Sequence, residues 1–458
     1  MEQKDFNPDD YFDNGRFLVD KMAGQFMAGN DVLTFNDNQT MLIYNPETGI
    51  WVDKAEITIK NFIRSALGAK ARRSLYEETL FFIKASTYFD RKNLDVHKNK
   101  VCLENGVYDL ITHEFSEFDP NLFITVKIPV KYDKEAACPK IIDFLYQVLN
   151  PDAIPQVQEF LGYCLWRSYP FHKAFIFTGC GSNGKSTLLN VMRSMIGGDN
   201  VTNISLQNID GNRFSSALMY NKLANLCNDI PRKSLFNTGI FKQLCGGDAV
   251  YAEEKFKSGF NFINYAKLCF SCNQLPETHD DSDAFFRRIV IVDFPNVFSG
   301  ETRDEALTSK LTTPEELSGL FNWALVGLER LFLQRNFSEC ASTQDTARDY
   351  KRRSSPISAF IMDCCKQETG ALTAKDDLYN AYTMFCDEWE MTVLDKALFS
   401  KKLRLHAPFI QEKRGNRAGG RKTEWVNIQL VKAETEKNDN PILSNYLTAP
   451  VIMSEIKT

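Results

Sequence analysis

The segment FIFTGCGSNGKSTLL constrains the fold more than any other part of the sequence. It contains Gly179, Gly184, Lys185 and Ser186 in the spacing G-x-x-x-x-G-K-S. An apolar run at 174–178 precedes it, and a helical pattern starts at Lys185. In this context glycines let backbone N–H groups turn toward phosphate oxygens, and the helix N-terminus adds partial positive charge. A chance glycine-rich turn is the other explanation, but the strand–loop–helix order predicts a nucleoside triphosphate site.

The loop residues divide the predicted chemistry among them. Lys185 is predicted to reach the β- and γ-phosphates, and the Ser186 hydroxyl is predicted to ligate Mg²⁺. Asp229 follows the apolar run 222–227 and is the predicted metal-linked acid, the alternative being a plain loop aspartate; Asp248 and Glu253 are weaker candidates. The expected cofactors are ATP and Mg²⁺. The residues predicted to bind the nucleotide are Gly179, Gly181, Ser182, Asn183, Gly184, Lys185, Ser186 and Thr187.

Further short apolar runs at 222–227, 266–272 and 289–294 alternate with helical patterns. Buried strands separated by helices favour a parallel sheet in an α/β fold. Asn273 follows one of these runs, where its amide could hydrogen-bond a γ-phosphate or the attacking water. Arg287 and Arg288 directly precede the last run. We expect them either to cap the surface or to reach a neighbouring subunit's nucleotide.

Composition sets the outer limits of the interpretation. The chain has 458 residues, of which 43% are hydrophobic and 25% are charged, and its net charge is −5. These values are typical of a globular protein with room for about three domains. The acidic N-terminus is unlike a secretory signal, and no run of about 18 apolar residues occurs. We therefore expect an intracellular, cytoplasmic protein, in a host cell if it is viral, without a membrane partner. Cys269 and Cys272 are expected to be core residues, because no second metal-ligand pair lies nearby.

The order of the motifs resembles the superfamily 3 helicases of viruses, phages and plasmids. In particular it is similar to the poxvirus-type primase-helicases and to the C-terminal family of phage and plasmid primases. The motifs that carry this resemblance are GCGSNGKST, LCNDIP, GGDAVYAEEKFKSGFNF, LCFSCNQLP and FFRRIVIVDF. The upstream segments NGVYDLITHEFSEFDPNLFITVKIPVKYD and QEFLGYCLW are similar to the accessory domain that precedes the ATPase in that family, so the resemblance covers roughly residues 95–365. The resemblance implies an AAA+ ATPase that forms a hexameric ring around DNA, unwinds it with 3′→5′ polarity and holds nucleotide between subunits.

The resemblance also implies roles for single residues. Lys185 and Ser186 take the P-loop roles, Asp229 is the metal acid, and Asn273 is the sensor. Arg288 or Arg287 is the arginine finger of the next subunit. Many such ATPases carry two acids where this chain has Asp229 alone, which leaves open which residue orients the attacking water.

The predicted fold class is α/β, with an AAA+ P-loop ATPase core between two smaller parts. An α+β accessory domain precedes the core, and a helical and winged-helix domain follows it. The predicted ranges are 1–150 for the accessory domain, 151–300 for the ATPase, 301–365 for a helical extension, 366–432 for a winged-helix-like DNA-binding domain and 433–458 for a tail.

One candidate for DNA contact is a hairpin. Residues 250–265 read as strand, tip and strand, and the resemblance implies a hairpin that holds DNA in the ring channel. Lys255 and Lys257 suit phosphate contacts, and Phe256 suits base stacking. A plain surface hairpin is the alternative.

The other candidate is a basic segment near the C-terminus. Between Lys396 and Lys422, nine basic residues stand against one acidic residue. A helix followed by a basic, glycine-rich strand–turn–strand favours a winged helix on DNA over a solvated face. A second cluster, at Lys70, Arg72 and Arg73, is expected to be a solvated helix face. The predicted DNA-binding residues of the C-terminal segment are Lys401, Lys402, Arg404, Lys413, Arg414, Arg417, Arg421 and Lys422.

The function predicted from these patterns is an ATP-dependent replicative DNA helicase of a virus, phage or plasmid-like element. Its expected partners are single-stranded or forked DNA and further copies of the chain, with a hexamer as the expected assembly. A separate primase or polymerase is a hypothesis, because the chain shows no carboxylate cluster suited to two-metal nucleotidyl transfer. The alternatives are an ATP-driven DNA translocase or packaging motor, and an origin-binding initiator that uses ATP as an assembly switch.

Overall fold

The computed structural model describes residues 6–212, 214–231, 235, 238–253, 259–276, 278, 280, 282–299, 304–389, 391–417 and 420–431. At 210, 353, 414–417 and 420–422 it describes the backbone only. The chain divides into two compact units, with the boundary between Tyr350 and Lys351. The finer division into five ranges stays a prediction.

The N-terminal part of the first unit combines three helices with a four-stranded sheet in the order β5-β4-β3-β6. Helix α2 buries Ile59, Ile63 and Leu67 at four-residue spacing, so one face packs into a core shared with α1 and α3. The elements of this part are η1 (Pro8–Tyr11), β1 (Phe12–Asp13), β2 (Arg16–Phe17), α1 (Val19–Met27), β3 (Val32–Phe35), β4 (Met41–Asn45), β5 (Ile50–Val52), α2 (Ala55–Leu67), η2 (Gly68–Lys70), α3 (Arg73–Ser86) and β6 (Tyr88–Phe89).

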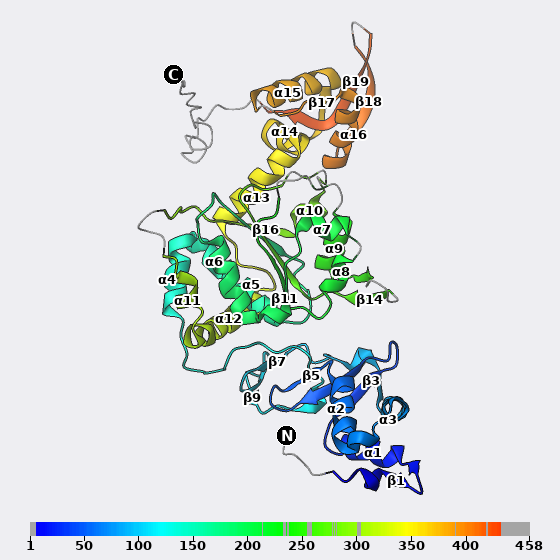
Figure 1. Ribbon diagram of the computed structural model, residues 1–458. Coiled ribbons are helices and arrows are strands. Elements are labelled where there is room, and N and C mark those ends of the chain that lie inside the picture. Colours follow the sequence, from blue (N-terminus) through cyan, green and yellow to red (C-terminus); the bar gives the residue numbers. More distant parts are fainter. Residues whose placement is uncertain are drawn as a thin grey trace, which may run out of the picture. The chain divides into compact units, whose positions relative to one another are not determined.

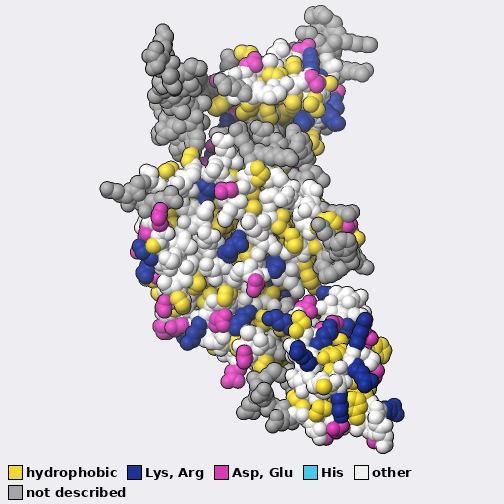
Figure 2. Space-filling model, viewed as in Figure 1, with side chains coloured by type: hydrophobic (Ala, Val, Ile, Leu, Met, Phe, Trp, Pro, Cys, Tyr) yellow, Lys and Arg dark blue, Asp and Glu magenta, His cyan; other side chains and the backbone are white. Residues whose placement is uncertain are grey.

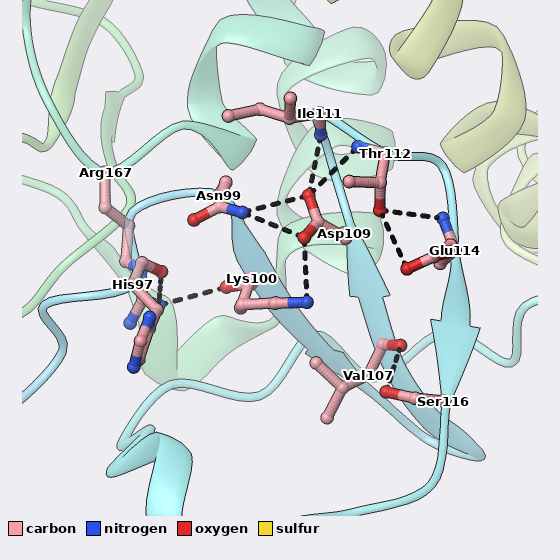
Figure 3. A network of polar contacts seen from close by, with 10 residues as sticks. All are labelled: His97, Asn99, Lys100, Val107, Asp109, Ile111, Thr112, Glu114, Ser116 and Arg167. Carbon is pink, nitrogen blue, oxygen red and sulfur yellow. Dashed lines mark hydrogen bonds and ion pairs between the residues drawn. The ribbon is translucent and has the colours of Figure 1, made fainter.

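A small antiparallel sheet follows, and one buried carboxylate organises its turn (Figure 3). Asp109 accepts hydrogen bonds from the Asn99 amide, the backbone N–H groups of Ile111 and Thr112, and the Lys100 ammonium 2.7 Å away. Burial alone would raise the pKa of Asp109, but these donors outweigh it and hold the pKa far below its usual range. The elements here are η3 (Arg91–Asn93), β7 (Lys100–Leu103), β8 (Gly106–Asp109), β9 (Phe115–Ser116) and η4 (Pro120–Leu122).

The centre of the first unit is a five-stranded sheet in the order β11-β12-β15-β10-β16, with every neighbouring pair parallel. Its central strands are buried on both faces, as expected for a parallel sheet covered by helices. Figure 1 shows α5, α6 and α12 on one side of this sheet and α7, α8 and α9 on the other. The strands are β10 (Ala174–Thr178), β11 (Val201–Thr202), β12 (Ala224–Cys227), β15 (Lys267–Cys272) and β16 (Ile289–Asp293).

The helices around the sheet share one hydrophobic core with it and with β7 and β8. The hairpin expected at 250–265 is present as the antiparallel pair β13 (Ala249–Ala252) and β14 (Phe260–Ile263). The remaining elements are α4 (Pro139–Val148), η5 (Pro151–Ala153), α5 (Ile154–Leu165), α6 (Lys185–Ile196), η6 (Gly198–Asn200), α7 (Leu206–Gly211), α8 (Ser215–Leu218), α9 (Gly239–Gly246), α10 (Asp283–Phe286), α11 (Leu307–Leu311), α12 (Pro314–Gln334) and α13 (Ala341–Ser354), in which the unit boundary lies.

The second unit packs three helices around Trp425 on an antiparallel sheet in the order β17-β19-β18. The helix that begins at Lys396 and the two strands expected after it are present, but β17 lies at 365–374, where the sequence predicted no strand. Its ten residues are mostly exposed, and a bulge between Gln367 and Leu372 breaks its register, so it lacks the alternating pattern of a half-buried strand. The elements are α14 (Pro356–Cys364), β17 (Cys365–Ala374), α15 (Lys375–Glu388), α16 (Lys396–His406), β18 (Gln411–Arg417) and β19 (Gly420–Leu430).

The described residues bear on membrane-spanning helices and on the cysteine pair Cys269 and Cys272. Among these residues, no helix combines the length and the apolarity needed to cross a bilayer. Cys269 and Cys272 are buried in β15, and no group of three or more potential metal ligands occurs in the described part of the chain. Both cysteines are core residues, as expected.

Candidate functional site

The loop between β10 and α6 has a backbone that requires glycine at two positions. Gly179 and Gly184 have φ angles of 143° and 90°. A Cβ at Gly179 would lie 2.4 Å from the Asn183 amide nitrogen, and one at Gly184 would lie 2.6 Å from Val148. Gly181, in contrast, has open space around the position of a Cβ. The loop is therefore held tightly at both ends, while its exposed middle is free for the close approach of a ligand.

Lys185 stands at the first position of α6 with its side chain buried inside the loop. Its ammonium donates to the carbonyl oxygen of Gly179 at 2.6 Å, to Asn183 Oδ1 at 2.9 Å and to Asn273 Oδ1 at 3.3 Å. All three acceptors are neutral. Burial lowers the pKa of Lys185, against a smaller opposite effect of Cys272 and Asp229. A desolvated cation held by neutral oxygens favours an anionic ligand that supplies the missing charge.

The N-terminus of α6 adds further donors at the same place. The first hydrogen bond inside the helix runs from Leu188 N–H to the carbonyl of Gly184, so the N–H groups of Lys185, Ser186 and Thr187 precede the helical ladder. Ser186 is exposed and Thr187 is partly exposed. The hydroxyls and N–H groups at this end can therefore reach a phosphate or a metal ion.

Asn273 and Asp229 follow the neighbouring strands β15 and β12, at the same edge of the sheet as the loop. The backbone of Asp229 has a φ of 48°, and its N–H donates to Ser271 Oγ at 3.1 Å. The side chain of Asp229 is exposed, while the neighbouring Asn228 Oδ1 is buried with no hydrogen-bond partner among the residues that the structure describes. The ends of β10, β12 and β15 thus place Lys185, Asn273 and Asp229 at one edge of the sheet, and the roles predicted for them stay predictions.

Asp293 is a further acid at this edge that the sequence analysis missed. It ends β16, directly opposite Thr178 at the end of β10. Burial raises the pKa of Asp293, and nearby Lys185 partly offsets that effect. The sequence does contain a signal for it, because Asp293 ends the apolar run IVIVD just as Asp229 follows the apolar run at 222–227.

Arg287 and Arg288 lie at the opposite edge of the sheet. Ile289 pairs with Ala174 at the start of β10, whereas the phosphate-binding loop follows the end of that strand. Arg287 is exposed. Arg288 donates to the Ala284 carbonyl at 2.5 Å, and its Nε is buried with no partner in the described part of the chain. With a full strand length between them, neither arginine is placed to serve the loop of its own chain.

Asp248, a weaker candidate for the metal acid, is found beside these arginines. The Cβ position of Gly246 lies 2.9 Å from Asp248 Oδ2 and 3.8 Å from Arg288 Nη2. Asp248 is therefore distant from Lys185. Glu253 is at the end of β13, in the hairpin.

The predicted DNA contacts are only partly within the described residues. Lys255, Phe256 and Lys257 lie outside them, and Arg414, Arg417, Arg421 and Lys422 are described by their backbone only, in β18 and β19. Lys401 and Lys413 are exposed and Lys402 is partly exposed. Arg404 instead forms an ion pair with Glu412, and its guanidinium lies 5.5 Å from the ring centre of the buried Trp425.

Three family models match the chain, one after the other. The model described as "D5 N terminal like" matches residues 30–150, "Family of unknown function (DUF5906)" matches 177–288, and "Poxvirus D5 protein-like" matches 352–433. The second match contains the loop, Asp229, Asn273 and both arginines. The resemblance to the poxvirus D5-type proteins that the motifs indicated is thereby confirmed.

Curated relatives are viral proteins. "Putative helicase L207/L206" of Acanthamoeba polyphaga mimivirus is 28% identical over 219 residues, which cover 45% of this chain and 23% of that protein. "Putative helicase V13" of Sputnik virophage is 26% identical over 248 residues, which cover 48% of this chain and 31% of that protein. The match therefore spans less than a third of the length of either relative.

A solved structure shares the fold. "The A form apo structure of NrS-1 C terminal region-CTR" aligns with a TM-score of 0.56 and 11% identity, covering 88% of this chain and 97% of that one. At 11% identity the match supports a shared fold and nothing further. It agrees with a mixed α/β chain built on a parallel five-stranded sheet around a P-loop.

Proposed function

We propose that this relative of the D5-type viral helicases is an ATP-dependent DNA helicase that works as a ring with 3′→5′ polarity. The observation that carries the proposal is the 3.3 Å contact between Lys185 Nζ and Asn273 Oδ1, made across two adjacent parallel strands. A loop that only bound an anion would need the lysine but not the neighbouring amide. A polar amide beside the lysine would suit the hydrolysis of a bound γ-phosphate.

The residues present fit ATP and Mg²⁺. A Cβ would fill the loop at Gly179 and Gly184, and the buried ammonium of Lys185 has neutral partners only. In the proposed site Lys185 binds the β- and γ-phosphates, and Ser186 and Asp229 hold the metal ion. When bound, Mg²⁺ neutralises charge that develops on the phosphate oxygens. Asn273 hydrogen-bonds the γ-phosphate or the attacking water and so orients the reacting groups.

The position of Arg287 and Arg288 supports a site shared between subunits. Both precede β16, a full strand length from the loop of the same chain. A head-to-tail ring would bring this edge of one subunit to the loop of the next. In that arrangement Arg288 or Arg287 stabilises the transferring phosphoryl group in trans.

DNA is the proposed partner of the second unit and of the β13–β14 hairpin. The second unit follows the order helix, strand, two helices and two strands, which supports the winged-helix interpretation, and Lys401 and Lys413 are exposed on it. The same ATPase would serve a DNA translocase or packaging motor, or an initiator that uses ATP to assemble. The hairpin favours strand separation, since an initiator that only assembles has no need of it. A separate primase or polymerase remains a hypothesis, for which a pull-down of replication proteins is the test.

The experiment that tests the proposed function measures ATP hydrolysis with and without single-stranded DNA. We expect DNA to stimulate hydrolysis and Lys185→Ala to abolish it. Lys134→Ala removes an exposed lysine that is not part of the loop and is the matched control. Hydrolysis by Lys185→Ala at the rate of the control would contradict the proposal.

A further inference from the structure

The N-terminal part carries a basic groove that the nucleotide site does not use. Between Lys54 and Ser86 there are seven Lys and Arg residues and three Glu residues, in a chain with a net charge of −5. Figure 2 shows Lys and Arg side chains interleaved with hydrophobic ones over this part of the molecule. Helices α2 and α3 form a groove of about 520 Å³ there, lined by Lys60, Arg73, Tyr76, Glu77 and Leu80.

Two arginines near this groove, Arg64 and Arg72, have no carboxylate partner among the described residues. Among the described residues, no side chain forms an ion pair or a hydrogen bond with the guanidinium of Arg64 or Arg72, and both arginines are exposed. Arg73 Nε lies 2.7 Å from Glu77, but the Arg73 side chain is 92% exposed. Such an exposed ion pair contributes little to stability, and the arginine can readily exchange Glu77 for another anion. The groove thus presents net positive charge to solvent.

Lys60 adds to this charge although a carboxylate is near. Its ammonium lies 3.5 Å from Glu56, whereas the Lys84 ammonium lies 2.7 Å from the same carboxylate. The hydrogen bond from Lys84 lowers the pKa of Glu56, against a smaller effect of burial. The Lys60–Glu56 contact is the longer of the two and both side chains are exposed, so the Lys60 ammonium can exchange this carboxylate for another anion.

Aromatic side chains accompany these cations. Tyr76 lines the groove, and Phe81 is 76% exposed one turn after Glu77 on α3. An exposed phenylalanine among basic residues is costly in water and suits a flat apolar partner. Nucleic-acid bases have such faces, and only unpaired strands present them.

We propose that the α2–α3 face binds single-stranded DNA, with phosphates on Lys60, Arg64, Arg72 and Arg73 and bases stacked on Phe81 and Tyr76. The sequence reading of Lys70, Arg72 and Arg73 as a solvated helix face is revised accordingly for the two arginines, while Lys70 forms an ion pair with Asp9. The choice of DNA as the ligand rests on the proposed function, whereas the groove and its charge are observed independently of that function. Bound there, a strand would be held by the N-terminal part independently of the ATPase cycle.

The test uses the full chain without nucleotide and measures the fluorescence anisotropy of labelled oligo(dT). We expect the double variant Arg64→Glu/Arg72→Glu to weaken binding about tenfold or more, and Phe81→Ala to weaken it about fivefold. The slope of log Kd against log salt concentration should fall by about 0.7 for each phosphate that the variant no longer neutralises. Lys134→Glu/Lys140→Glu is the control with the same change of charge, and Tyr146→Ala removes an aromatic ring that is 60% exposed elsewhere.

Photo-crosslinking of iododeoxyuridine-substituted oligo(dT) completes the test, because it locates the stacked base. Crosslinks to the peptide that contains Tyr76 and Phe81 support the proposal. They would do so even if the chain hydrolysed no ATP, an outcome that would overturn the proposed function alone. Binding of both variants like their controls, in a protein that hydrolyses ATP and unwinds DNA, would overturn the inference and leave the function standing. Loss of affinity for polyglutamate with unchanged affinity for oligo(dT) would overturn it in favour of an acidic protein partner.

Discussion

Asn273 offers a sharp test of the site, because it separates binding of the nucleotide from hydrolysis. Asn273→Ala removes one of three neutral oxygens around the Lys185 ammonium and leaves Gly179 and Asn183 in place. The contact is long at 3.3 Å and Asn273 is exposed, so its loss should cost about 1 kcal/mol or less in the free protein. We therefore expect the melting temperature and the Kd for ATP to change little.

The effect on catalysis should be much larger. Loss of a donor that acts on the transition state costs about 2.7–4 kcal/mol, which corresponds to about 10²–10³ in kcat. Steady-state ATPase kinetics and equilibrium nucleotide binding, measured on the same preparation, give both quantities. Gln274→Ala changes the next exposed residue and is the matched control.

Asn273→Asp is a second variant for this test, because it adds a negative charge to a side chain of nearly the same size. A carboxylate 3.3 Å from the ammonium would attract it by about 5 kcal/mol at an effective dielectric constant of about 20, less the screening at this exposed position. The lysine would then be paired before ATP arrives, so ATP should bind more weakly while the protein is no less stable. A kcat for Asn273→Ala within about threefold of the wild type, or a loss confined to KM, would refute the reasoning.

Three further predictions concern other parts of the chain. Gly184→Ala forces a Cβ into a filled position at positive φ and should destabilise the first unit by about 2–5 kcal/mol, whereas Gly181→Ala should leave the melting temperature unchanged; equal melting temperatures would contradict the described loop. Lys185→Ala and Arg288→Ala should each be inactive, and mixing them should restore part of the ATPase activity if the site lies between subunits; a mixture as inactive as its components would argue against the finger in trans. Asp109→Asn should lower stability at pH 7 by about 2 kcal/mol in thermal melts. Because folding lowers the pKa of Asp109, the carboxylate stabilises the fold above about pH 4, and this stabilisation is lost as the pH falls. The difference in stability between the wild type and Asp109→Asn should therefore become smaller in acid; a difference that does not change with pH would contradict this role of Asp109.

The sequence predicted the central sheet well because its signals are local. The apolar runs at 174–178, 222–227, 266–272 and 289–294 each contain a buried parallel strand, and the glycine spacing of the loop reflects two backbone angles that only glycine adopts without strain. Lys185, Asn273 and Asp229 could be grouped because parallel strands end at one edge of a sheet.

Other features depend on contacts that no local pattern contains. Strand β17 is exposed and bulged, and it is defined by its pairing with β19. The ion pair of Arg404 with Glu412 and its contact with Trp425 join residues from three different elements, and no local pattern places these elements together; the DNA contact of the exposed Arg404 stays a prediction.

The basic groove was hidden for the same reason. Lys60 and Arg73 belong to different helices, and only the packing of α2 against α3 sets them side by side. A count of charges along the chain cannot separate such a groove from a solvated face.

Strand displacement from a partial DNA duplex tests the central claim most directly. The wild-type chain should release the labelled strand only with ATP and Mg²⁺, and Lys185→Ala should release none. Opening should proceed from a 3′ single-stranded tail. ATP hydrolysis stimulated by DNA without release of either strand would contradict the helicase assignment and favour a translocase.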